Sequence, residues 1–290
     1  MTIPLNEFWK KIESLEICDK ASIQKISTQI GEKIGKDSDH DSVTVAKYLI
    51  KGEWITRYQA KLLLSSKHEA LRSGSYLILS DEAVPPFAGW FSARSLLNQK
   101  RGFLTNLSLE RTLPLLLAEG SSQDLRQHRS LQKYAIEVEG DHCRVFTSLP
   151  EGETLAARLI AEPIMNSQHL LKIGKNLAEA LVSLHSVRSM RGSLLPEHVW
   201  VTKKAEAILL LEPSTDPSAA SLQGPSSCKP LNAPEVELGG ESFSEQSDLF
   251  LLGCLLFRMA TGEDPYPAST GNKTAKPNVD TYRVPDKVAN

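Results

Sequence analysis

The sequence has no long hydrophobic run and no basic cluster, and each absence excludes a class of protein. The longest apolar stretch, residues 249–256, is interrupted by Gly253 and is far shorter than the ~20 residues that a membrane-spanning helix needs. Its 33 basic and 35 acidic residues nearly cancel, without the clustered basic surface that a nucleic-acid-binding protein needs. We therefore expect no membrane contact from this segment and no nucleic-acid partner.

Cysteine is also scarce, and the N-terminus lacks the basic and apolar segments of a secretory signal. The four cysteines lie far apart and form no C-x-x-C pair, which excludes a zinc or redox signature; they are Cys18, Cys143, Cys228 and Cys254. Such cysteine usage is typical of a reducing compartment. We expect a cytoplasmic location and leave open a membrane anchor beyond residue 290.

The first 72 residues have the spacing of helices. Apolar residues recur every three or four positions between residues 5–15 and 23–34, which indicates amphipathic helices. Asp41 or Ser42 is placed to cap the next helix, and Thr56 with Gln59 fits a capping box. We predict a small helical bundle here, with Trp9 and Trp54 in its core.

After Gly74 the pattern changes to short strands, which we place at residues 75–79, 89–93, 102–107, 135–138 and 143–147. The last two flank a hairpin turn at residues 139–142. A helix is expected somewhere within residues 108–130. The five strands predict an antiparallel sheet.

The rest of the chain is mainly helical. Leucine and isoleucine repeat at helical spacing over residues 170–184, and an apolar helix over residues 247–259 is followed by Gly262 as its C-cap. Two short strands at residues 198–202 and 207–211 come between them, followed by a proline- and serine-rich loop at 213–234. These elements predict an α+β fold, divided into a leader domain at 1–72 and further parts at 75–150 and 151–290.

Six short motifs, in order, resemble the bacterial eukaryotic-like Ser/Thr protein kinase family. They are L-P-E-G-E-T-L at 149–155, L-H at 184–185, L-P-E-H-V-W-V at 195–201, A-P-E at 233–235, S-D-L-F-L-L-G at 247–253 and T-G-E-D-P at 261–265. The helical leader is similar to a segment found ahead of many such kinases. The resemblance implies a two-lobed protein kinase-like fold, with a small five-stranded N-lobe and a mainly helical, truncated C-lobe. It also implies further helices and domains after residue 290.

The positions that carry phosphoryl transfer in this family hold other residues here. The position of the catalytic base falls at Ser193, whose hydroxyl is a very weak proton acceptor. The strand lysine falls at Asn106, whose amide carries no charge, and Gly89 is the remaining glycine of the glycine-rich loop. The metal-binding asparagine falls at His198, whose imidazole suits zinc or copper better than magnesium. Glu212 falls at the metal-binding aspartate and keeps a carboxylate.

The framework positions of the family are retained. They are Ala233, Pro234, Glu235, Asp248 and Gly253. By resemblance, Asp248 ties down the backbone of the catalytic loop, and Glu235 pairs with an arginine that would lie beyond residue 290.

We therefore interpret the chain as a catalytically inactive pseudokinase that binds protein partners as a scaffolding or signalling module, without a cofactor. One alternative is an atypical ATP-dependent Ser/Thr protein kinase of weak activity. It would use Glu212 for the Mg²⁺ of Mg-ATP, with Lys100 or Arg101 in place of the strand lysine. A second alternative is an interaction domain with no kinase ancestry.

Overall fold

The computed structural model describes residues 3–18, 20–34, 41–81, 86–87, 89–111, 128–211, 233–239 and 243–266. The chain divides into two compact units. The first comprises Met1–Val84, Gly89–Leu107 and Ala135–Ser148, and the second comprises Pro85–Ala88, Ser108–Tyr134 and Leu149–Asn290. The first unit thus contains both the helical leader and the main sheet.

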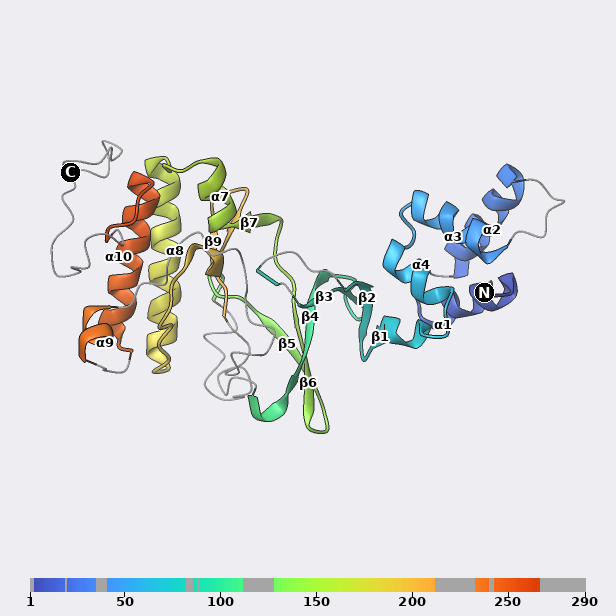
Figure 1. Ribbon diagram of the computed structural model, residues 1–290, viewed down its shortest axis with the longest axis horizontal. Helices are drawn as coiled ribbons and strands as arrows, with labels where there is room; N and C mark the ends of the chain where they lie inside the picture. Colours follow the sequence, from blue (N-terminus) through green and yellow to red (C-terminus); the bar gives the residue numbers. More distant parts are fainter. Residues whose placement is uncertain are drawn as a thin grey trace. The chain divides into compact units, whose positions relative to one another are not determined.

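Four helices form the leader, as the sequence predicts (Figure 1). They are α1 (Leu5–Ser14), α2 (Lys20–Ile34), α3 (Ser42–Lys51) and α4 (Arg57–Leu63). The side chain of Asp41 accepts a hydrogen bond from the backbone N–H of Thr44, so Asp41 caps α3. The capping box of Thr56 and Gln59 begins α4. A shared apolar core that includes Phe8, Ile12, Leu49 and Leu63 holds the helices together.

The main sheet is antiparallel wherever its register is defined, and its strands run in the order β1-β2-β3-β4-β6-β5. These strands are β1 (Arg72–Ser73), β2 (Tyr76–Ser80), β3 (Phe91–Ser95), β4 (Arg101–Ser108), β5 (Tyr134–Glu139) and β6 (His142–Thr147). The five strands expected from the sequence are present, with the predicted turn between β5 and β6. The sixth, β1, has two residues, too few for an alternating pattern to be read in the sequence.

The leader packs against the edge of this sheet. The side-chain amide of Gln59 donates a hydrogen bond to the carbonyl oxygen of Ile78 at 3.0 Å, and the hydroxyl of Thr56 donates to that of Leu79. Because β1 is so short, these carbonyls of β2 lie beyond its reach, and the start of α4 satisfies them instead. The capping box therefore both begins a helix and closes the edge of the sheet.

The two faces of the first three long strands differ in character. Leu77, Arg94 and Arg101 are cross-strand neighbours in one row, and Leu77 belongs to the leader core. Residues of the adjacent row face the other way, where a second cluster forms from Tyr76, Ile78, Ala93, Leu104 and Phe146. Because side chains alternate along each strand, one face of the sheet points toward the leader and the other face carries the second apolar cluster.

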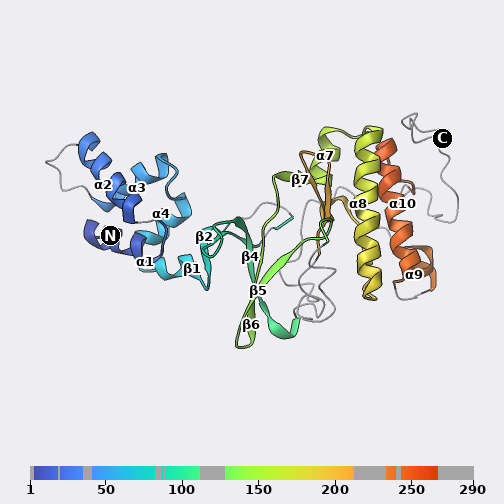
Figure 2. The ribbon, with the colours of Figure 1, turned by 180° about the vertical axis from the view of Figure 1, so that it is seen from behind.

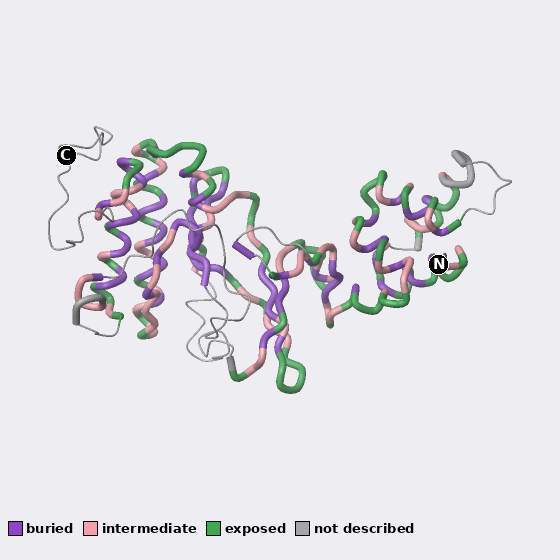
Figure 3. Tube along the Cα trace, in the orientation of Figure 1, coloured by how far each residue is buried: buried purple, intermediate pink, exposed green. Residues whose placement is uncertain are grey.

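The second unit contains two long helices and a small antiparallel sheet. Its helices are α7 (Leu155–Ala161), α8 (Ser167–Ser186), α9 (Pro234–Gly239) and α10 (Glu245–Thr261), and its strands are β7 (Gly152–Thr154), β8 (Val199–Thr202) and β9 (Ala207–Leu209). Helices α8 and α10 lie side by side, as both Figure 1 and Figure 2 show. Most of their buried apolar positions belong to one core, and buried positions alternate with exposed ones along each helix (Figure 3). Gly262 ends α10 in the left-handed conformation, at φ 80°, as predicted.

Some expected segments cannot be compared with the structure. The helix predicted within residues 108–130 falls mostly on residues 112–127, and most of the proline-rich loop falls on residues 212–232, both outside the described residues. The described helices are all too short or too polar to cross a membrane.

Candidate functional site

The loop at residues 191–198 connects the end of α8 to β8, and α10 fixes its backbone. The carboxylate of Asp248 in α10 accepts hydrogen bonds from the backbone N–H groups of Arg191 and Gly192, each at 2.8 Å. Nε2 of His185, at the end of α8, lies 2.8 Å from the same carboxylate. Only 1% of Asp248 is exposed, so these partners replace the water that a buried carboxylate has lost.

Gly192 takes a conformation that suits a glycine. Its φ is +69°, in the left-handed region, and a Cβ there would lie 2.9 Å from the ring of Phe243. The loop therefore approaches its surroundings closely at the residue that Asp248 holds.

The position of the catalytic base, Ser193, is half-buried in this loop. The loop does contain one carboxylate, that of Glu197, which is buried. The sequence alone gives no signal for Glu197, because it occupies a variable position of the motif.

His198 is buried at the end of the loop, in a single 3₁₀ turn (Pro196–His198). Its backbone N–H donates to the carbonyl of Leu195, and its carbonyl accepts from the N–H of Leu210. Burial and, to a smaller extent, the nearby charge of Arg191 lower the pKa of its imidazole from 6.5 to about 3, while a hydrogen bond with the backbone of Ser193 acts in the opposite direction. The ring is therefore neutral near pH 7.

The candidate positions of the first unit lie on the sheet and beside it. Asn106 is exposed on β4 and lines a cavity of about 480 Å³ together with Glu139, Cys143 and Arg144. Gly89 is exposed, with φ at +84°. Arg101 lies five residues before Asn106 on the same strand, so the two side chains point to opposite faces of the sheet. Lys100, the other cation considered, is exposed just before β4.

The last acidic candidate, Glu212, lies outside the described residues. No group of three or more potential metal ligands occurs in the part of the chain that the structure describes.

The framework residues surround the start of α10. Ala233 is buried and Pro234 begins α9. The carboxylate of Glu235 accepts a hydrogen bond from the hydroxyl of Ser247 at 2.8 Å, which links α9 to the first turn of α10. Gly253 is exposed, and apart from its chain neighbours and the backbone of its own helix, no described atom lies within 4 Å of where its Cβ would be.

Comparison with known proteins finds partial matches to Ser/Thr protein kinases at low identity. The chain is 30% identical over 129 residues to serine/threonine-protein kinase 31 of Homo sapiens. The aligned region covers 43% of the chain and 12% of that protein. It is 27% identical over 157 residues to the probable serine/threonine-protein kinase fnkB of Dictyostelium discoideum, covering 49% of the chain and 29% of that protein. A shorter stretch of 43 residues, 15% of the chain, is 51% identical to serine/threonine-protein kinase PknJ of Mycobacterium tuberculosis. No family model matches the chain.

These matches support a protein kinase-like domain, and the mixed α+β structure with its antiparallel sheet is consistent with one. The matched regions span less than a third of each of these relatives.

Proposed function

We propose that this kinase-like domain is a pseudokinase, a binding or scaffolding module that does not transfer phosphate. The observation that carries the proposal is the loop at residues 191–198. Asp248 holds its backbone through two hydrogen bonds, as a catalytic loop requires, yet its chemical positions hold Ser193 and a neutral, buried His198.

The residues present fit Mg-ATP poorly. Phosphoryl transfer depends on positioned cations and metal ligands that neutralise phosphate charge. A neutral imidazole is a poor ligand for magnesium, which prefers oxygen. The amide of Asn106 adds no positive charge, and Arg101 points to the opposite face of β4. No step of phosphoryl transfer can be assigned to these side chains.

The apolar face of the main sheet supports the same proposal. Leu104 lies two residues before Asn106, hence on the same face, and it is fully buried. Phe146 stacks on Tyr76 beside it, with ring centroids 4.7 Å apart. A nucleotide base on this part of the face would have to displace side chains that already pack together, at a cost of several kcal/mol.

Nucleotide binding and phosphate incorporation test the proposal together. The purified chain with Mg-ATP or Mn-ATP should show neither a substantial rise in melting temperature nor incorporation of labelled phosphate into itself or into casein. Phosphate transfer that is lost in Glu212→Ala and retained in Glu162→Ala, which changes an exposed carboxylate of the same unit, would establish the atypical kinase instead.

A further inference from the structure

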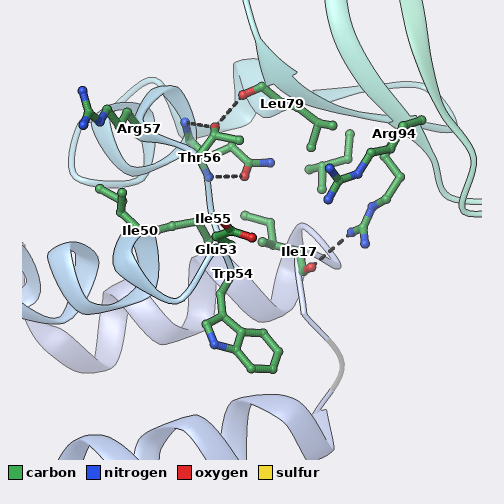
Figure 4. Close-up of a pocket in the computed structure, with 12 residues that line it drawn as sticks. Ile17, Ile50, Glu53, Trp54, Ile55, Thr56, Arg57, Leu79 and Arg94 are labelled. Atoms are coloured by element: carbon green, nitrogen blue, oxygen red, sulfur yellow. Dashed lines mark hydrogen bonds between the residues drawn. The ribbon is translucent and has the colours of Figure 1, made fainter. Parts of the chain in front are cut away.

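A groove runs between the leader helices and the leader-facing side of the sheet, within the first unit. Two cavities form it, with volumes of about 490 and 610 Å³. They share five lining residues, namely Ile17, Glu53, Trp54, Arg94 and Arg101. Figure 4 shows the first cavity, with Trp54, Ile17 and Arg94 around it. Because the cavities share these residues, they are adjacent, and we describe them together as the groove.

Two arginines stand side by side in the groove. Arg94 of β3 and Arg101 of β4 are direct cross-strand partners, and both line the two cavities. Like charges directly opposite each other destabilise a sheet by a few tenths of a kcal/mol or more. Among the described residues neither arginine forms an ion pair, although Glu53 lines both cavities and Glu13 and Glu16 line the second. The fold thus holds two like charges side by side, with carboxylates in the groove that are not paired with them.

Part of the guanidinium of Arg94 forms hydrogen bonds with the leader. One of its terminal nitrogens donates to the carbonyls of Glu16 and Ile17, each at 3.1 Å. Its Nε is buried and has no hydrogen-bond partner among the described residues. Leaving a buried donor unsatisfied costs about 1–3 kcal/mol.

An apolar strip lies beside these cations. The indole of Trp54 is 39% exposed and lines both cavities, so the expectation that it is a core residue is wrong. Ile17, Ile55 and Leu77 are buried and form the floor of the first cavity. The residue before Trp54, Glu53, has φ at +58°, a left-handed conformation that a residue with a side chain adopts at some cost.

We propose that this groove binds an acidic peptide segment of a partner protein. Carboxylates of the peptide contact the Arg94–Arg101 pair, and a large apolar side chain next to them packs against Trp54. The arginines favour an acidic peptide because the planar guanidinium matches the geometry of a carboxylate. Tryptophan and arginine are also typical anchor residues of protein interfaces. The groove, with cations beside an apolar strip, suits an extended segment better than a single compact ligand. The proposal gives the partner class for the proposed binding role, and it stands whether or not the kinase-like site transfers phosphate.

Titration with a labelled peptide tests it on the full chain. The probe is a fluorescein-labelled peptide of sequence Gly-Asp-Glu-Leu-Phe-Asp-Glu-Gly, followed by anisotropy at about 0.15 M salt, where weak surface attraction is screened. One control peptide replaces its acids by Asn and Gln, and another replaces Leu-Phe by Gly-Ser. We expect each control peptide to bind at least about tenfold more weakly. One lacks the carboxylates that contact the arginines, and the other lacks the apolar side chains that pack against Trp54.

Two matched variants distinguish binding in the groove from nonspecific attraction of the peptide to any nearby positive charge. Arg101→Gln should weaken binding about tenfold, whereas Lys100→Gln, which removes a neighbouring exposed cation outside the groove, should change it less than about twofold. In the absence of peptide, Arg101→Gln should raise the urea midpoint slightly, because it removes the repulsion, and Lys100→Gln should not. This measurement also shows that the variant is folded.

Tryptophan indole signals in an NMR titration give the location. The signal of Trp54, assigned with Trp54→Phe, should move on addition of the peptide while those of Trp9, Trp90 and Trp200 stay in place. The proposal is overturned if the acidic peptide does not bind at about 1 mM, if both arginine and lysine variants lose affinity equally, or if free glutarate competes as well as the peptide. Because none of these measurements involves ATP, failure here is distinct from failure of the pseudokinase proposal.

Discussion

The side-chain amide of Gln59 donates a hydrogen bond to the carbonyl oxygen of Ile78 at 3.0 Å, which ties the start of a leader helix to strand β2 of the main sheet. The other end of the same amide accepts from the backbone N–H of Thr56. Gln59 is 2% exposed, so water does not reach either bond. One residue therefore joins two parts that the sequence suggests are separate.

Replacing this residue should destabilise the first unit. Gln59→Ala leaves the Ile78 carbonyl and the Thr56 N–H without these partners, and we expect a loss of about 2–3 kcal/mol in the free energy of unfolding. Urea denaturation checks it, with the exposed Lys61→Ala on the same helix as the control. Equal effects of the two changes would mean that the bonds contribute nothing specific.

Removal of the leader tests its independence as a domain. Leu77 of β2 is buried within the leader core, so a chain starting at residue 72 exposes it together with the unpaired edge of β2. We expect this shortened chain to aggregate or to lose the near-ultraviolet circular dichroism of its sheet aromatics. A soluble, cooperatively folding product would support a separate leader domain at residues 1–72.

The carboxylate of Asp248 should be essential to the loop that it holds. Asp248→Ala leaves two backbone N–H groups and His185 without their shared acceptor, and we expect a loss of about 3 kcal/mol or more. Limited proteolysis should then cut within residues 188–195 faster than in the native chain. Gln246→Ala, an exposed change on the same helix, serves as the control. Unchanged protection of the loop in Asp248→Ala would contradict the role of the carboxylate.

The neutral state of His198 predicts a particular dependence of stability on pH. Its folded pKa of about 3 lies below the ordinary value of 6.5, so on acidification the unfolded chain binds the proton first. Its contribution to stability is fully present above pH 6.5 and is lost as the pH falls toward about 3. The loss from this group amounts to roughly 2 kcal/mol by pH 5.

Urea midpoints between pH 7 and pH 5 measure this effect. His198→Gln should flatten the dependence by removing the titrating group, whereas His142→Gln, at an exposed site, should leave it unchanged. A slope that is the same in His198→Gln and in the native chain would show that His198 is not buried in its neutral form.

Two glycines should respond to alanine with opposite sign. A Cβ at Gly102 in β4 would lie 2.1 Å from the carbonyl oxygen of Thr147 and 2.8 Å from the ring of Phe146, so Gly102→Ala should cost about 3 kcal/mol or more. Gly253 in α10 has open space around that position, so Gly253→Ala should stabilise by about 0.5–1 kcal/mol. Thermal unfolding of both variants checks the pair.

Local signals in the sequence predicted most elements of the fold. The capping box at Thr56, the cap at Asp41 and the glycine after α10 each depend on hydrogen bonds or φ angles within a few residues, so their pattern survives without knowledge of distant contacts. Periodicity located α8 and α10 for the same reason. The short strand β1 was missed, because two residues carry no period.

The residue types at the candidate site can also be read from the sequence, because they depend only on which residues stand at the motif positions. That Ser193 and Asn106 carry no charge follows from their side chains alone. The protonation of His198 does not, because burial and the neighbouring Arg191 set its pKa.

The sequence by itself determined most of the described helices and strands and the residue types at the kinase-like motif positions. Only the tertiary structure decided that the leader closes the edge of the sheet, that Arg94 and Arg101 face each other and that Trp54 lines a groove. The physical reason is that strand register and helix packing bring together residues far apart in the chain, and a one-residue change of register would turn each arginine to the opposite face.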